Sequence, residues 1–228
     1  MTIVDGVIPK PIIEDFRKWN ISGSLKTQVA ALKKEFPDGA VTEVKTIPLK
    51  VEGLTVRTEL ADNNKLIRRD LIIGLREPFR PAFVFKANIT TLPVAGATLD
   101  LEPFFSFAPG TFTGSDCDGK KKICDFTLSS IEYVPAWRGF LILTSNEHPS
   151  NTFYGNILWF LADEKINSWC KVTVPQIVWQ FEKEPKEHKA EGICVLSGNA
   201  ETLRVALVYD NDVKSSLLQN ITLAKEKK

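Results

Sequence analysis

The feature that most constrains the fold is a change of hydrophobic period near residue 40. Beyond it, short runs rich in Val, Ile, Thr and aromatic residues follow one another, separated by Pro, Gly, Asn or Asp. In many of these runs the apolar residues occupy alternate positions, as they do in strands that bury one face. No segment of helical length and period interrupts the series. This argues against a parallel fold built from βαβ units.

The chain has 228 residues, of which 43% are hydrophobic, so it can bury a sizeable core. We predict one mainly antiparallel β-sandwich, jelly-roll-like, over residues 41–228, because many short strands at this spacing are typical of such folds. The predicted strands lie within residues 41–53, 54–60, 66–75, 82–89, 98–107, 122–134, 139–144, 155–162, 170–181, 192–197, 202–209 and 220–224. Two longer connections are expected, at 108–120 and 145–155.

The first 40 residues have a helical pattern instead. Ile12, Phe16 and Trp19 are spaced as i, i+4 and i+7, which places them on one face of a helix. Pro11 suits the first turn of that helix, and a second apolar series runs from Leu25 to Phe36. We therefore predict an N-terminal helical segment over residues 1–40, packed on or beside the sandwich.

Charge and cysteine content narrow the class of protein. The 29 Lys and Arg residues nearly balance the 28 Asp and Glu residues, giving a net charge of +1. This argues against a strongly basic packaging protein, because neutralising phosphates requires excess cation, although it leaves room for a local basic patch. Four cysteines do not make a disulfide scaffold, and no apolar run approaches the roughly 20 residues of a membrane span. We expect an intracellular protein without a transmembrane segment.

The stretch GSDCDGKKKICD, residues 114–125, looks most like a ligand site. Aligned with the calcium loop of an EF-hand, its first ligand position falls on Gly114, which has no side chain, and Asp125 replaces the bidentate Glu. Lys120, Lys121 and Lys122 would also repel a divalent cation. We expect no metal here, but a surface hairpin with a basic tip, since Asp-Gly dipeptides favour hairpin turns.

The cysteines and histidines give little support for catalysis or zinc binding. Cys117 and Cys124 lack the spacing of a zinc pair, and whether they form a disulfide depends on geometry. The two histidines lie in polar or charged stretches, while Cys170 and Cys194 lie in predicted strands, where we expect buried, inert thiols. There is no nucleophile elbow, HExxH motif or phosphate-binding glycine loop. We predict a non-enzymatic protein without a cofactor.

Basic residues suggest where nucleic acid could bind. Arginine and lysine contact phosphates, and neighbouring aromatic rings can stack on bases. Asp70 and Glu77 dilute the positive charge, so a solvated charged strand is the alternative interpretation. The candidate residues are Arg68, Arg69, Arg76, Arg80, Lys120, Lys121 and Lys122.

One segment carries a family resemblance. In GNILWFLAD a glycine, Gly155, leads an apolar strand that ends at Asp163, and GICVLSGNAETLRVALVYDND follows downstream. This order of features resembles the thirty-kilodalton superfamily of plant-virus movement proteins. The resemblance implies a fold related to the viral jelly roll, with Asp163 anchoring a strand end.

The function implied by the resemblance is cell-to-cell transport of a virus. The protein would bind single-stranded RNA or DNA together with host or viral proteins, in the host cytoplasm and at cell junctions. Two alternatives stay open. One is a virion structural protein of capsid type that self-associates through sheet edges and loops, and the other is an unrelated intracellular interaction domain.

Overall fold

The computed structural model describes residues 50–61, 63, 65–77, 82–91, 99–108, 111–113, 123–147, 153–167, 169, 172–181, 189–210 and 216–225. The predicted helical segment over residues 1–40 lies outside these ranges. So do Arg80 and Lys120–Lys122. Within the described residues the fold is mainly β, as predicted.

Thirteen strands and two short 3-10 helices follow one another along the described chain. They are β1 (Lys50–Leu60), β2 (Leu66–Glu77), β3 (Ala82–Asn88), β4 (Glu102–Phe107), β5 (Thr111–Thr113), β6 (Ile123–Asp125), β7 (Thr127–Val134), η1 (Pro135–Trp137), β8 (Gly139–Glu147), β9 (Phe153–Ala162), η2 (Asp163–Lys165), β10 (Gln176–Phe181), β11 (Lys189–Gly198), β12 (Thr202–Asp210) and β13 (Leu217–Ala224). Strand β5 lies within the connection expected at 108–120, β6 lies within the strand predicted at 122–134, and β8 and β9 both extend into the connection expected at 145–155.

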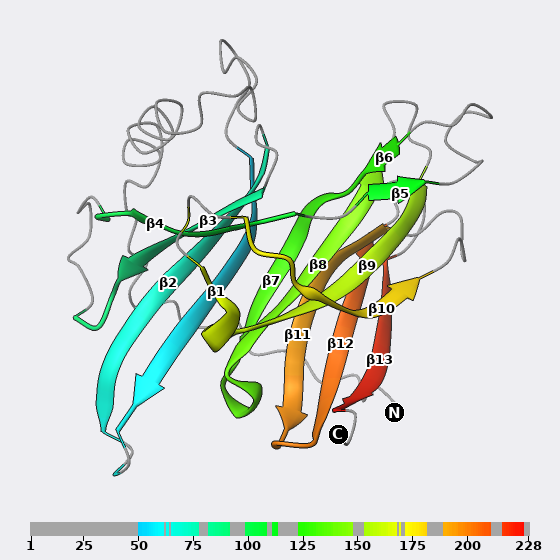
Figure 1. Cartoon of the computed structure of the whole chain (residues 1–228). Coiled ribbons are helices and arrows are strands. Elements are labelled where there is room, and N and C mark those ends of the chain that lie inside the picture. Colours follow the sequence, from blue (N-terminus) through cyan, green and yellow to red (C-terminus); the bar gives the residue numbers. More distant parts are fainter. Residues whose placement is uncertain are drawn as a thin grey trace.

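The strands form three main antiparallel sheets (Figure 1). The first sheet has the order β1-β2-β3-β4, the middle sheet β10-β9-β8-β7 and the third sheet β11-β12-β13, while β5 and β6 pair separately. Within each sheet, hydrogen-bonded neighbours are consecutive in the chain. A jelly roll contains Greek-key connections, which place non-consecutive strands side by side. The described pairings are meanders and do not confirm the jelly-roll topology.

Strand β8 of the middle sheet is buried on both faces, so the described part of the chain has three layers of strands. Phe140 and Ile142 of β8 belong to a core shared with the first sheet, whereas Leu141 and Leu143 belong to a core shared with the third. The apolar run GFLILT has no polar alternation because neither face of β8 meets water. The predicted face-to-face packing of antiparallel sheets is thus confirmed, with a third layer that the sequence did not indicate.

A pair of glycines brings the first and middle sheets close together. Gly53 of β1 and Gly74 of β2 are register partners, and β7 crosses directly over them. A methyl group at Gly74 would collide with the side chain of Leu128, and one at Gly53 would collide with Ile131. These positions therefore need glycine for close approach.

Side-chain hydrogen bonds join the edge strands of the three sheets. The backbone N–H of Tyr133 in β7 donates to Thr55 Oγ1 of β1 at 3.1 Å, and Thr55 Oγ1 donates to Glu132 Oε2 at 3.1 Å. On the other side of β7, the N–H of Ile193 in β11 donates to Ser130 Oγ at 3.3 Å. Strand β7 therefore links β1 to β11.

Candidate functional site

Asp163 lies where the last residue of β9 meets η2. Its backbone N–H donates to the carbonyl oxygen of Arg138 at 2.8 Å, which continues the β8–β9 ladder by one bond. Arg138 itself ends η1 in the left-handed conformation, with φ of 51°. The two 3-10 turns at this end of the middle sheet are thus held together through the backbone of Asp163.

The side chain of Asp163 binds two residues from other strands. Its Oδ2 accepts a hydrogen bond from the Tyr133 hydroxyl at 3.0 Å and from Arg57 Nη2 at 3.3 Å. The Asp163 side chain is 14% exposed and that of Arg57 is 25% exposed. The Arg57 guanidinium also lies 5.8 Å from the ring centroids of Phe104 and Tyr133, within the range of a cation–π contact. Asp163 therefore connects β1, β7 and β9.

Burial and charge shift the pKa values in this group. Burial by itself lowers the pKa of the Arg57 guanidinium, but the negative charge of Asp163 and the hydrogen bond with Tyr133 outweigh it and raise that pKa. The pKa of the Tyr133 hydroxyl is raised, first by burial and then by the charge of Asp163. Both groups stay protonated at neutral pH, so Arg57 and Tyr133 act as donors to a single carboxylate.

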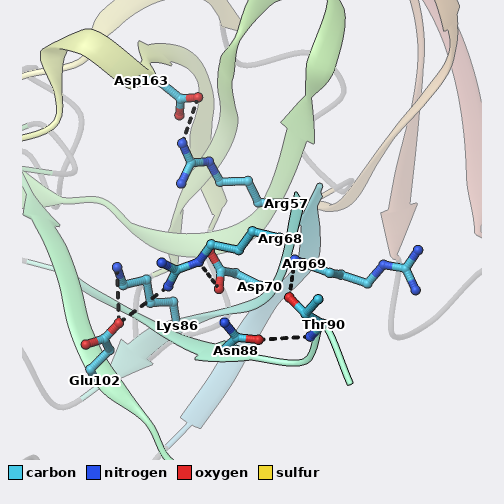
Figure 2. Close-up of polar contacts among 9 residues, drawn as sticks. All are labelled: Arg57, Arg68, Arg69, Asp70, Lys86, Asn88, Thr90, Glu102 and Asp163. Atoms are coloured by element: carbon cyan, nitrogen blue, oxygen red, sulfur yellow. Dashed lines mark hydrogen bonds and ion pairs between the residues drawn. The ribbon is translucent and has the colours of Figure 1, made fainter. Parts of the chain in front are cut away.

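A second group of charges lies beside the first on the same face of the first sheet (Figure 2). Arg68 Nε is 2.8 Å from each carboxylate oxygen of Asp70, which is 1% exposed. Lys86 Nζ lies 3.1 Å from Glu102 Oε1 and 4.9 Å from the centroid of the Phe104 ring. Arg68 Nη2 approaches the same Glu102 oxygen at 3.8 Å. We call the residues of both groups the charged cluster: Arg57, Arg68, Asp70, Lys86, Glu102 and Asp163.

The charged cluster is electrically balanced. Its three cations each lie within 4 Å of at least one of its three carboxylates. A phosphate would therefore have to displace a carboxylate to gain a cation as partner. The cluster serves to hold strands together better than to receive an anion.

Arg69 differs from its neighbour Arg68. Along β2 it alternates onto the opposite face, the face that carries Leu71 and Ile73. Its backbone N–H donates to Thr90 Oγ1 at 2.8 Å, and its side chain extends away from the charged cluster (Figure 2). Among the described residues, no carboxylate lies within ion-pair distance of its guanidinium.

The remaining predicted site residues are placed as follows. Arg76 is 5% exposed and lies 3.5 Å from Glu52 Oε1, so it is an internal residue of the fold. Gly155 is buried and has φ of 144°, opposite a register shift between β8 and β9. That φ strongly favours glycine. The sequence did not single out Arg57, Lys86 or Tyr133, because their partners lie far away along the chain.

No metal or transmembrane feature is found in the described part of the chain. Among those residues there is no group of three or more His, Cys, Asp and Glu side chains that could hold a metal ion. Cys194 is a free, exposed cysteine, so the expectation of a buried thiol there was wrong, because its side chain lies on the outer face of β11. Cys117, Cys170 and both histidines lie outside the described ranges. None of the described helices is long and apolar enough to cross a membrane.

Comparisons with known proteins identify no relative. No family model, curated protein or solved structure matches the chain.

Proposed function

We propose that this chain is a non-enzymatic binding protein of the movement-protein type, which contacts single-stranded nucleic acid and protein partners. The role in cell-to-cell transport, the location at cell junctions and a relationship to the viral jelly roll belong to the same proposal. They rest on the resemblance carried by the segment from Gly155 to Asp163.

The observation that supports nucleic-acid contact is the position of Arg69. Its side chain leaves the charged cluster, and no carboxylate among the described residues neutralises it (Figure 2). An arginine of this kind can donate to a phosphate without first breaking an ion pair. Arg68 and Arg76 contribute less, because Asp70 and Glu52 already bind them. Arg80 and Lys120–Lys122, outside the described residues, complete the proposed contact set.

A salt series tests this proposal. Filter binding of a single-stranded RNA oligonucleotide is measured between about 50 and 200 mM salt for the wild type, Arg69→Gln and a Lys120→Gln/Lys121→Gln/Lys122→Gln variant. Each phosphate contact to a single strand contributes about −0.7 to the slope of log K against log salt. We expect the slope to become shallower by about 0.7 for Arg69→Gln and by about 2 for the triple variant, if all three lysines contact phosphates.

Arg204→Gln is the matched control. Arg204 is an exposed strand arginine on β12, in the third sheet, and no carboxylate among the described residues lies within ion-pair distance of it. Its loss removes the same charge from a surface outside the proposed contact set. The proposal is overturned if the wild type does not bind RNA at these salt concentrations, or if Arg204→Gln changes the slope as much as Arg69→Gln.

A further inference from the structure

The outer edge of β13, with which no described strand pairs, is unlike the other edges of the three main sheets. An exposed strand edge presents unpaired N–H and C=O groups that can pair with another chain, and proteins normally protect such edges. Strands β1, β7 and β11 are joined to one another by the hydrogen bonds of Thr55 and Ser130. The edge of β4 is met by Thr173, whose N–H donates to the carbonyl of Ser106 at 2.9 Å.

Strand β10 is protected differently from β13. It follows Pro175 directly, and its pairing with β9 shifts register between Ile177 and Trp179. Strand β13, LLQNITLA, contains no charged residue and no proline, and its pairing with β12 runs from Leu217 to Ala224 without a register shift. The described strand therefore has no charge, proline or bulge of the kind that discourages strand addition.

The hydrogen bonds of β13 show which backbone groups are available. The N–H of Lys225 donates to the carbonyl oxygen of Glu201 at 2.9 Å, one step beyond the Thr202–Ala224 pair. In an antiparallel ladder such bonded pairs alternate with pairs whose N–H and C=O groups point away from the partner strand. The odd-numbered residues therefore bond to β12. The even-numbered residues direct their backbone groups to the free edge: Leu218, Asn220, Thr222 and Ala224.

The surroundings of this edge fit an uncharged, apolar strand. A groove of about 360 Å³ lies between β10 and β13, lined by Val178, Trp179, Ile221, Thr222, Leu223 and Ala224. None of these side chains is charged. Leu218, on the outer face of the third sheet, is 66% exposed. An added strand would find backbone partners at the edge and apolar side chains beside it.

We propose that the occupant of this edge is β13 of a second copy, paired antiparallel about a two-fold axis. Residues opposite one another must lie on the same face of the joined sheet, so even-numbered residues pair with even-numbered residues. One such register places Asn220 on the axis and Leu218 opposite Thr222 of the partner subunit. The two third sheets then form one continuous six-stranded sheet.

Symmetry and charge favour a second copy over a foreign strand. In a two-fold pair each copy covers the edge of the other, and the joined sheet gains no new open edge, whereas a foreign strand would leave its own far edge exposed. Lys225 follows the end of β13, and Asp210, at the end of β12, lies beside its start. Antiparallel pairing brings Lys225 of each copy toward Asp210 of the other, and Lys189, the register partner of Asp210, forms an ion pair with Glu191.

The oligomeric state of the full chain tests the proposal. The monomer has a mass of 25.5 kDa, so light scattering after size exclusion should give about twice that value at 100 µM. Asn220→Pro removes an N–H that points to the free edge and spares the ladder to β12. Two hydrogen bonds are lost per dimer, which should weaken dimerisation by about tenfold to a hundredfold. Leu218→Lys should weaken it as well, because a charged side chain replaces the apolar one that lies opposite Thr222 of the partner subunit.

Leu196→Lys is the matched control, because Leu196 is 51% exposed on β11, away from the free edge. It should dimerise like the wild type, and circular dichroism should show that all three variants fold. Hydrogen exchange supplies a second measurement: the amides of Leu218, Asn220 and Thr222 should exchange more slowly at 100 µM than at 1 µM. A monomer at 100 µM overturns the proposal and leaves the edge to a foreign strand. A dimer that tolerates Asn220→Pro and Leu218→Lys overturns the assignment to β13. Neither result depends on RNA binding.

Discussion

Replacing Asp163 by alanine tests whether this residue holds three strands together. The substitution removes the acceptor for the Tyr133 hydroxyl on β7 and for the guanidinium of Arg57 on β1. The buried part of the Arg57 side chain then keeps its positive charge with no carboxylate within ion-pair distance among the described residues. A partly buried charge that loses its partner destabilises more than the pair itself contributed.

The magnitude follows from the two contacts. A hydrogen bond to a charged acceptor contributes about 1.5–3 kcal/mol. The ion pair adds up to about 1 kcal/mol, because a quarter of the Arg57 side chain is exposed to screening solvent. We expect Asp163→Ala to lower the free energy of unfolding by about 2–4 kcal/mol, which corresponds to a Tm lower by about 5–15 °C in a chain of this length. Tyr133→Phe, which removes only the hydroxyl, should cost less.

The assay is urea unfolding at pH 7, followed by the fluorescence of the five tryptophans. Asp163→Ala, Tyr133→Phe and the double variant form a thermodynamic cycle, and the double variant should cost at least about 0.5 kcal/mol less than the sum of the single variants. Asp100→Ala is the control, since Asp100 is exposed and should change stability by less than about 0.5 kcal/mol. An Asp163→Ala variant as stable as Asp100→Ala, or a strictly additive cycle, would refute the anchoring role.

Two further predictions concern Gly155 and Glu132. Gly155→Ala should lower the free energy of unfolding by about 1–3 kcal/mol, because alanine is strained at φ of 144°. Gly192→Ala is the control and should be close to neutral, because its added methyl would make only ordinary contact with Val208. Equal changes in Tm for the two variants would contradict this prediction. Burial raises the pKa of Glu132 in the folded state, so the folded protein holds this proton more tightly than the unfolded chain. The contribution of Glu132 to stability therefore falls as pH rises from 4.5, the ordinary pKa of a glutamate, through the raised pKa of the folded state. Glu132→Gln should therefore be more favourable relative to wild type at pH 7 than at pH 4, and a difference in unfolding free energy that does not vary with pH would contradict the raised pKa.

Hydrophobic patterning predicted the strands well because it reports burial directly. The segment GFLILT was correctly expected to be a strand, and β8 continues from it to Glu147. What the pattern could not give was the number of layers. Apolar residues at both odd and even positions of β8 show that both of its faces are buried. The sheets that cover those faces contain β2 and β12, which are far away along the chain.

The charged cluster was hidden for the same reason. Arg57 and Asp163 are 106 residues apart in sequence, and no local spacing relates them. Asp163 was singled out only through a resemblance, which gave no partner for it. Gly155 is different, because a glycine at the start of an apolar strand is itself a sign of an unusual backbone angle or a bulge. The structure supplies that reason, a positive φ opposite a register shift.

The distinction between Arg68 and Arg69 could have been drawn from the sequence. On a strand, residues i and i+2 share a face, so in RRD the first arginine lies beside the aspartate and the second does not. The structure has this arrangement, with Arg68 on both oxygens of Asp70 and Arg69 on the other face. A cluster of basic residues on a strand should therefore be divided by parity before its members are counted as phosphate contacts. By the same alternation the even-numbered residues of β13 direct their backbone groups away from β12, toward the edge that the proposed second copy would occupy.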